Sequence, residues 1–179
     1  MQKRNIVLIG FMGTGKTTTG KIMSKMLGYP FIDIDEVIEK RYSLTINEIF
    51  RLKGEEYFRE IESKTVNEVS KSKGTIIACG GGVVKKVINI HNLKMNGIVI
   101  CLKADAEVIY KRLNINNEIR PLNEIRPLAS DKSKEEILKL ITEREELYNR
   151  ADMFVDTSNE SPFYIAKKII VSLNLMKMD

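Results

Sequence analysis

The chain has 179 residues, which is within the usual range for one domain, so we expect a single domain over residues 1–179. Hydrophobic residues make up 43% and charged residues 30%, which is typical of a globular protein, and no apolar run is long enough to cross a membrane. The net charge is +5, but the lysines are scattered and no stripe of arginines and aromatic residues accompanies them, so we expect no nucleic-acid partner.

Short apolar runs alternate with helical patterns along the whole chain. Most residues in these runs are apolar, which is typical of strands that are covered on both faces of a parallel sheet. The alternation predicts an α/β domain of three layers with right-handed crossovers. The expected strands are Asn5–Ile9, Phe31–Asp33, Thr75–Ala78, Ile98–Leu102 and Met153–Asp156.

The helices between the strands have recognisable ends. Capping boxes at Thr45–Glu48 and Ser133–Glu136, and a serine before a first-turn proline at Ser161–Pro162, indicate helix starts. Gly54 and Gly74 are placed where helices should end. One connection, from about Asn114 to Ser133, has little apolar periodicity, and a connection of this length is usually functional or disordered.

A phosphate-binding motif follows the first strand. Residues Gly10–Thr17 read GFMGTGKT and match G-x-x-x-x-G-K-[ST]. The glycines let successive N–H groups point at phosphate oxygens, Lys16 reaches the β- and γ-phosphates, and the Thr17 hydroxyl ligates Mg²⁺. The alternative, a plain glycine-rich turn, fits a full match between a strand and a helix less well. We therefore expect a nucleoside triphosphate and Mg²⁺ at Gly13, Thr14, Gly15, Lys16, Thr17 and Thr18.

Binding a nucleoside triphosphate leaves the reaction open. A guanine-nucleotide switch should carry Asn-Lys-x-Asp near a later strand end, whereas this chain has Leu102–Asp105 there. Leucine cannot make the hydrogen bonds of the amide, so Asp105 is better interpreted as the cap of a helix that begins at Ala106.

Acidic residues follow the second strand. Asp33 and Asp35 lie at its carboxyl end, where ligands bind in open parallel sheets. One acid could support the metal or its water while the other holds a hydroxyl group. The alternative is that Asp35 only caps a helix over Glu36–Arg41, and capping could coexist with function.

Three later features are weak when each is taken alone. Arg59 and Glu62 are i, i+3 neighbours in a helix expected from about Glu55 to Ser70, a spacing that usually marks a surface ion pair. Gly80–Gly82 permits close approach of the backbone to a ligand, or only a tight turn. Arg144 by itself is one charge on a solvated helix face.

Together these pieces resemble the shikimate kinase family. The matching segments are GFMGTGKT, DID at Asp33–Asp35, FRxxE at Phe58–Glu62, GGG at Gly80–Gly82, RPL in the long connection, and ER..LY..AD..VDT from Glu143 to Thr157. They occur in the family's order and cover nearly the whole chain. The phosphate loop alone is common to many proteins, but the combination is specific.

The resemblance implies transfer of the ATP γ-phosphate to the 3-hydroxyl of shikimate. It implies that Asp35 holds the acceptor hydroxyl and serves as base, that Arg59 and Arg144 grip the shikimate carboxylate, and that Gly81 donates a backbone N–H. It also implies that Asp33 would act on the metal through water and that Lys16 would be catalytic. The implied fold is nucleoside monophosphate kinase-like, with a five-stranded parallel sheet in the order 2-3-1-4-5. Helices at about 33–62 bind the acceptor, Arg112 stacks on adenine, and the loop after Asp156 lines the base.

In the same family the long connection, here about 114–133, is a lid that brings an arginine to the phosphates. This chain departs from the pattern because NEIRPL occurs twice in succession, over residues 117–128. The number of residues between Arg112 and Arg120 is about the number that the family has between the corresponding positions. When residues are counted back from Arg144 instead, Arg126 fits the family spacing better. We favour Arg120 as the catalytic lid arginine because it follows the hinge side, with Arg126 as the alternative.

The compartment is inferred from the cysteines and the start of the chain. Cys79 and Cys101 lie in apolar runs without metal-ligand spacing, so we expect reduced core thiols. The basic start runs directly into the phosphate loop without a signal cleavage site. We expect a cytoplasmic monomer that binds no membrane.

Two rival functions use the same phosphate loop. One is another small-molecule kinase, for gluconate or a nucleoside monophosphate; a nucleotide acceptor would need a base pocket, where this chain has acids and arginines. Gluconate also has a carboxylate and hydroxyls, so only the combined family pattern argues against it. The other rival is a catalytically silent ATP-binding regulator, although every polar position that the chemistry needs is filled.

Overall fold

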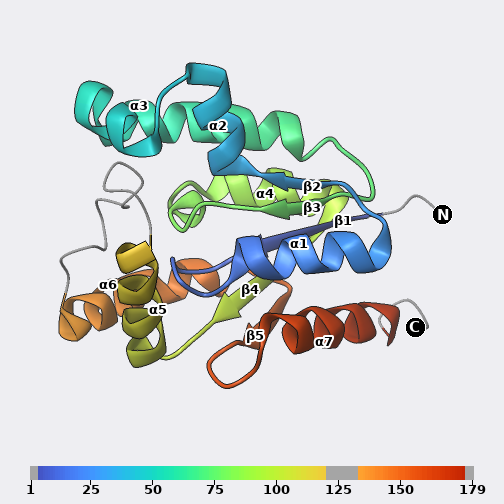
Figure 1. Cartoon of the computed structure of the whole chain (residues 1–179). Coiled ribbons are helices and arrows are strands. Elements are labelled where there is room, and N and C mark those ends of the chain that lie inside the picture. Colours follow the sequence, from blue (N-terminus) through green and yellow to red (C-terminus); the bar gives the residue numbers. More distant parts are fainter. Residues whose placement is uncertain (1–3, 120–132, 176–179) are drawn as a thin grey trace.

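The computed structural model describes residues 4–119 and 133–175. Strands and helices alternate along these residues, as the sequence predicts (Figure 1). In chain order the elements are β1 (Asn5–Ile9), α1 (Lys16–Leu27), β2 (Phe31–Asp33), α2 (Ile34–Tyr42), α3 (Ile46–Val69), β3 (Ile76–Ala78), the 3₁₀ turn η1 (Val83–Lys85), α4 (Val87–Asn96), β4 (Gly97–Lys103), α5 (Ala106–Ile119), α6 (Lys134–Tyr148), β5 (Met153–Asp156) and α7 (Pro162–Leu175).

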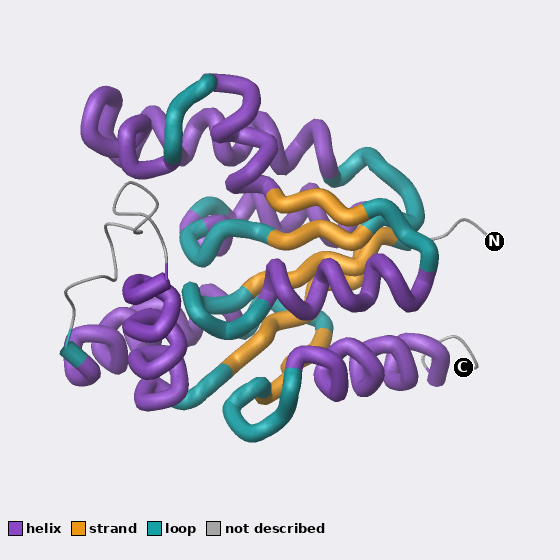
Figure 2. Tube along the Cα trace, viewed as in Figure 1, coloured by secondary structure: helices purple, strands orange, loops and turns teal. Residues whose placement is uncertain are grey.

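The strands form one five-stranded parallel sheet in the order β2-β3-β1-β4-β5, which confirms the order implied by the resemblance (Figure 2). At its centre, Val7 of β1 pairs with Ile77 of β3 and with Val99 of β4. Three strands have the predicted bounds, while β3 begins one residue later and β4 extends by one residue at each end. Because the strands are parallel, all their carboxyl ends meet at one edge, where ligands bind in sheets of this type.

Helices cover both faces of the sheet, because alternate residues of each strand point to opposite sides. Val7 and Ile9 belong to a core cluster shared with α3 and α4, whereas Ile6 and Leu8 belong to a second cluster shared with α1 and α7. None of these four side chains is more than 6% exposed. Figure 1 shows α1 in front of the sheet and α4 behind it. The three-layer prediction is confirmed.

Local sequence signals account for several helix ends. Both predicted capping boxes are present: the Thr45 hydroxyl accepts a hydrogen bond from the N–H of Glu48, and Ser133 does the same for Glu136. Gly54 has φ 81° and ψ 171° within the span of α3, so the first helical stretch stops there as predicted and a second one follows.

One predicted helix end is confirmed and one predicted boundary is wrong. The helix expected from about Glu55 to Ser70 ends at Val69, and Gly74 lies beyond it, between α3 and β3, with φ 61°. The long connection was expected to begin near Asn114, but α5 continues to Ile119. Ile109 and Leu113 of α5 pack against the phosphate loop, so tertiary contacts support this helix where its asparagine-rich sequence favours it only weakly.

Two expectations from the composition can be compared with the described residues. Cys79 and Cys101 are buried free thiols, as predicted. Burial raises the pKa of both thiols, that of Cys101 to about 11. Within residues 4–119 and 133–175, no helix has both the length and the apolar character that crossing a membrane requires.

Candidate active site

The phosphate loop joins β1 to α1 and is curled by its glycines. Gly13 and Gly15 have φ of 77° and 89°, a left-handed conformation that strains residues with a side chain. Lys16 is the first residue of α1, and its ammonium donates to the carbonyls of Gly10 and Phe11 at 2.9 and 2.8 Å. The loop therefore already has the conformation that surrounds an anion with N–H groups, at the positive end of a helix dipole.

Asp33 connects the phosphate loop to the second strand. Its Oδ2 accepts a hydrogen bond of 2.8 Å from the Thr17 hydroxyl. Its Oδ1 accepts one of 3.0 Å from the N–H of Asp35 and so caps α2. The alternative in which Asp35 caps a helix over Glu36–Arg41 is therefore wrong. The helix begins at Ile34, directly at the strand end, which places Asp35 in its first turn.

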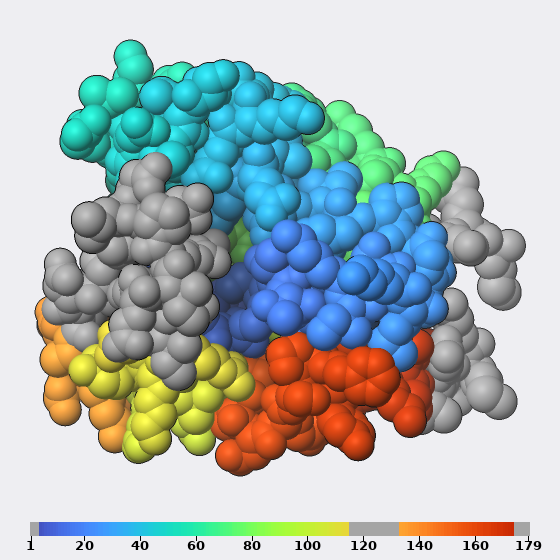
Figure 3. All heavy atoms as spheres, viewed as in Figure 1, coloured from blue at the N-terminus to red at the C-terminus, as the bar shows by residue number. Residues whose placement is uncertain are grey.

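A cavity of about 750 Å³ brings seven of the predicted site residues together. Figure 3 shows the surface hollowed between the helices α2 and α3 and the start of α1. The walls are formed by residues from opposite ends of the sequence. Among them are Thr17, Thr18, Asp33, Asp35, Arg59, Gly81 and Arg144.

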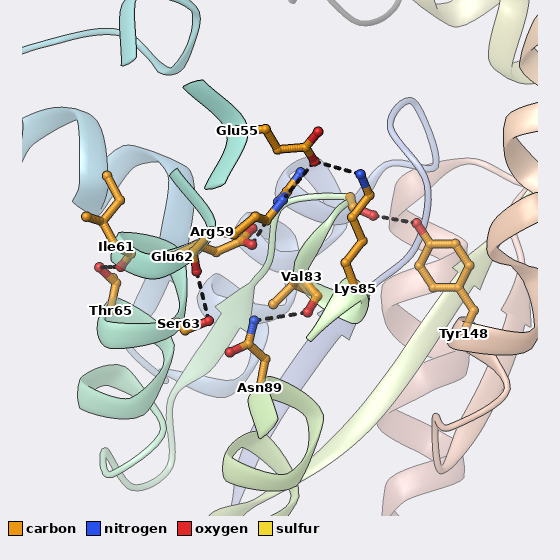
Figure 4. A network of polar contacts seen from close by, with 11 residues as sticks. Glu55, Arg59, Ile61, Glu62, Ser63, Thr65, Val83, Lys85, Asn89 and Tyr148 are labelled. Carbon is orange, nitrogen blue, oxygen red and sulfur yellow. Dashed lines mark hydrogen bonds and ion pairs between the residues drawn. The ribbon is translucent and has the colours of Figure 1, made fainter. Parts of the chain in front are cut away.

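Arg59 and Glu62 form a buried ion pair, so the interpretation as a surface pair is wrong. The Arg59 Nη1 atom lies 2.7 Å from Glu62 Oε2, and the two residues are 8% and 0% exposed (Figure 4). On its other side, Arg59 Nε donates to Glu55, which also pairs with Lys85. The guanidinium lies over the Phe58 ring, 5.0 Å from the centroid. Arg59 is thus held in one orientation at the cavity wall.

Glu62 has an unusual environment for a carboxylate. Burial raises its pKa to about 7, and the charge of Arg59 acts against that rise. Its Oε1 atom is buried and has no hydrogen-bond partner among the described residues. Burial therefore makes the protonated form of Glu62 easier to reach than it is for an exposed glutamate.

The glycine triplet leaves room for the acid and the arginine. A Cβ atom on Gly80 would lie 2.7 Å from Asp35 Oδ1, and one on Gly82 would lie 2.5 Å from Arg59 Cζ. Neither glycine has a left-handed φ. Close approach, and not turn geometry, therefore explains why glycine is needed at these two positions.

Arg144 lies in the cavity wall and is half-buried, so it is not a charge on a solvated face. Its Cζ atom lies 5.5 Å from the centroid of the Phe11 ring, next to the phosphate loop. One helical turn later, the Tyr148 hydroxyl donates a 2.7 Å hydrogen bond to the Gly81 carbonyl. Sequence reasoning gave Tyr148 no role, although it lies within the quoted family segment.

Arg112 joins the phosphate loop to the loop after β5. Its Nη1 atom donates to the Gly13 carbonyl at 3.3 Å and to Thr157 Oγ1 at 3.1 Å. Burial lowers its pKa from the ordinary value. Thr157 was not singled out, but it is the first residue of the loop after Asp156 that was expected to line the base, just beyond the carboxyl end of β5.

The two candidate lid arginines, Arg120 and Arg126, lie outside the described residues. The described chain stops at Ile119 in α5 and resumes at Ser133, the cap of α6. The choice between these arginines stays a prediction from the sequence.

Comparisons with known proteins agree on one family. The shikimate kinase family model matches residues 12–174. A shikimate kinase from Thermodesulfovibrio yellowstonii is 44% identical over 167 residues, 93% of each chain. One from Caldicellulosiruptor bescii is 40% identical over 174 residues, 97% of each chain. Among solved structures, shikimate kinase from Acinetobacter baumannii in complex with shikimate has a TM-score of 0.89 and 32% identity, covering 99% of this chain and 96% of that chain.

Proposed function

This chain belongs to the shikimate kinase family, and we propose that it transfers the γ-phosphoryl group of ATP to the 3-hydroxyl of shikimate, giving shikimate 3-phosphate and ADP. It is an ATP-dependent kinase of aromatic amino-acid biosynthesis. One observation carries the proposal: a single cavity is lined by the acid Asp35 and the guanidinium groups of Arg59 and Arg144, together with Thr17 and Asp33. Such a cavity suits an acceptor that has both a hydroxyl and a carboxylate.

The arginines are proposed to bind the acceptor carboxylate. Arg59 and Arg144 come from α3 and α6 and reach the same cavity. A guanidinium matches a carboxylate in a bidentate fork, so two of them fix both its position and its plane. Glu62 holds Arg59 through Nη1, which reduces the freedom that substrate binding has to remove. The N–H of Gly81 adds a neutral donor.

Asp35 is proposed to hold the acceptor hydroxyl and to take its proton. It lies in the first turn of α2, at the carboxyl end of the sheet and in the cavity wall. Phosphoryl transfer has a loose transition state with little bond formation to the acceptor, so alignment of the hydroxyl matters more than the strength of the base. The hydroxyl oxygen then attacks the γ-phosphorus and ADP leaves. The proton of the acceptor hydroxyl passes to Asp35.

The phosphates of ATP are proposed to lie in the loop from Gly13 to Thr18. Lys16 is positioned there by two loop carbonyls, and we expect its ammonium to turn from them to the β- and γ-phosphates when nucleotide binds. Arg112, held against Gly13 and Thr157, is proposed to stack on adenine. The loop after Asp156 would line the other side of the base.

The residues around Thr17 fit a magnesium ion. The Thr17 hydroxyl and the Asp33 carboxylate are 2.8 Å apart, and both are the oxygen donors that Mg²⁺ prefers. We propose that Thr17 ligates the ion and that Asp33 holds one of its water molecules. When bound, the ion would neutralise charge on the β- and γ-phosphates.

The remaining expectations about organisation are proposals of the same kind. Residues 1–179 would act as one domain, in which the helical region at about 33–62 binds the acceptor and the segment at about 114–133 closes over ATP. We also propose a cytoplasmic monomer without a nucleic-acid partner.

The decisive experiment compares acceptors in parallel. Purified protein with Mg²⁺ and ATP would be given shikimate, gluconate or nucleoside monophosphates, and ADP release would be followed. Rapid release with shikimate alone is expected, and Asp35→Asn, which keeps the shape but removes the charge, should abolish most of it. Faster release with gluconate would overturn the acceptor assignment. Nucleotide binding without turnover on any acceptor would indicate a silent regulator.

A further inference from the structure

The three carbonyls of the glycine triplet have different kinds of partner. The Gly80 carbonyl accepts from the N–H of Val83 at 3.1 Å, and the Gly82 carbonyl accepts from the N–H of Lys85 at 3.0 Å. Both bonds are local and follow from the turn into η1. The Gly81 carbonyl instead accepts from the side chain of Tyr148, which is 67 residues away in the sequence. The middle peptide of the triplet is thus held from another element, α6.

Tyr148 is well placed to hold this carbonyl firmly. It is the last residue of α6, is 4% exposed and belongs to the core cluster that β1 shares with α3 and α4. In Figure 4 its hydroxyl points at the glycine loop. Burial raises the pKa of this hydroxyl far above its ordinary value, so it stays protonated and able to donate. The charge of Arg144, which lies one helical turn earlier on α6, acts against that rise.

The glycine triplet itself has few other means of staying in place. Glycine has no side chain to pack and the widest backbone freedom. The backbone of the triplet must nevertheless be positioned accurately, because Gly80 borders Asp35 and Gly82 borders Arg59. A Cβ on Gly81 would lie 3.4 Å from the backbone nitrogen of Met12, so the middle residue also borders the phosphate loop. A shift of the triplet would therefore disturb the acid, the arginine and the phosphate loop together.

We propose that Tyr148 is a positioning residue of the acceptor site: by donating to the Gly81 carbonyl, it holds the glycine triplet in register with Arg144. The inference rests on the proposed function and deepens it. Tyr148 acts through the triplet and Arg144 and does not touch the reacting atoms. The ring of Tyr148 would then stabilise the core, and its hydroxyl would contribute to the affinity for the acceptor.

The test is Tyr148→Phe, which keeps the ring and removes only the hydroxyl. We expect the KM and the calorimetric dissociation constant for shikimate to rise about tenfold, as for a lost hydrogen bond that leaves its partner unsatisfied. The kcat should change less than about threefold and the KM for ATP less than about twofold, because the lost contact serves acceptor binding in ground state and transition state alike. Tyr164→Phe is the matched control: Tyr164 is 64% exposed on α7, and its variant should behave as the parent.

Each other outcome overturns the inference. Unchanged shikimate affinity with a lower melting temperature would make the hydroxyl purely structural. Weaker binding of ATP and shikimate to the same extent would indicate general damage to the fold. Failure of the proposed function is distinguishable from both, since it would be seen in the parent protein, which would then not phosphorylate shikimate.

Discussion

The carboxylate of Glu62 and the guanidinium of Arg59 form a 2.7 Å ion pair that is almost completely removed from water. Breaking such a pair leaves an uncompensated buried charge. The pair is also on the wall of the acceptor site. Its ionisation therefore influences both the stability of the fold and the hold on a substrate carboxylate.

Glu62 should make stability fall as pH rises. Its pKa in the folded chain is about 7, above the ordinary value of 4.5, because burial disfavours the carboxylate. The folded state therefore binds a proton more tightly than the unfolded state between these values. The stabilisation is complete below pH 4.5 and is lost as pH rises through 7, at up to about 1.4 kcal/mol per pH unit.

Denaturant unfolding of the parent and of Glu62→Gln between pH 5 and pH 8 measures this effect. The stability of the parent relative to the variant should fall across the range by on the order of 2 kcal/mol. The exposed Glu60 is in the same helix, and Glu60→Gln is the control, which should show no such trend. A difference between parent and Glu62→Gln that is independent of pH would contradict the assignment.

The three glycines of the triplet should respond differently to alanine. In Gly82→Ala the new Cβ overlaps the Arg59 guanidinium, so we expect the KM for shikimate to rise about tenfold or more. In Gly80→Ala it approaches Asp35 Oδ1, so the main loss should be in kcat, again about tenfold or more. Steady-state kinetics with shikimate as the varied substrate separates the two.

Gly81→Ala is the internal control for this series. Its nearest neighbour would be the backbone nitrogen of Met12 at 3.4 Å, which is almost an ordinary contact, so both constants should change only a few-fold. None of the three glycines has a left-handed φ, so backbone strain should not add to the effects. Equal losses in all three variants would show that the triplet supplies backbone freedom and not room for the neighbouring side chains.

Asp33→Asn should weaken the response to magnesium while preserving the fold. Asparagine is a good N-cap, so its amide oxygen can still accept the hydrogen bond from the N–H of Asp35. The charge next to Thr17 is lost, and we expect the Mg²⁺ concentration for half-maximal activity to rise about tenfold. Titrating Mg²⁺ at fixed ATP measures this, with Thr17→Ser as the control that keeps a hydroxyl. An unchanged Mg²⁺ requirement would rule out Asp33 as a support for the ion.

The two lid candidates can be separated by single substitutions. If Arg120 is the arginine that stabilises the transferring phosphate, Arg120→Ala should lower kcat at least about a hundredfold, while Arg126→Ala should have little effect. Turnover of both variants at saturating shikimate and ATP decides the matter. The reverse pattern would assign the role to Arg126. Small and equal losses would mean that either copy of NEIRPL can supply it.

Much of the fold follows from signals within short stretches of sequence. The five strands are recognisable as short apolar runs, of which β1, β3 and β4 are largely buried on both faces while β2 and β5 at the sheet edges are only partly buried. Three of the five have the predicted bounds. The capping boxes at Thr45 and Ser133 and the interruption at Gly54 depend only on neighbouring residues, so they too are predictable. Boundaries were predicted less well where packing decides, as in α5, which Ile109 and Leu113 anchor against the phosphate loop.

By itself, the sequence determined which chemical groups are present and in what local order: a phosphate loop, acids after a strand, an i, i+3 Arg–Glu pair and a run of glycines. Only the tertiary structure decided that Asp33, not Asp35, caps α2, that the Arg59–Glu62 pair is buried, and that Tyr148 holds Gly81. The burial of the ion pair and the contact of Tyr148 with Gly81 depend on packing between residues far apart in the chain, and the cap depends on where β2 stops pairing with β3. An i, i+3 spacing is the same for an ion pair in water and for a buried one. Whether water is excluded from the pair depends on the packing of the surrounding chain.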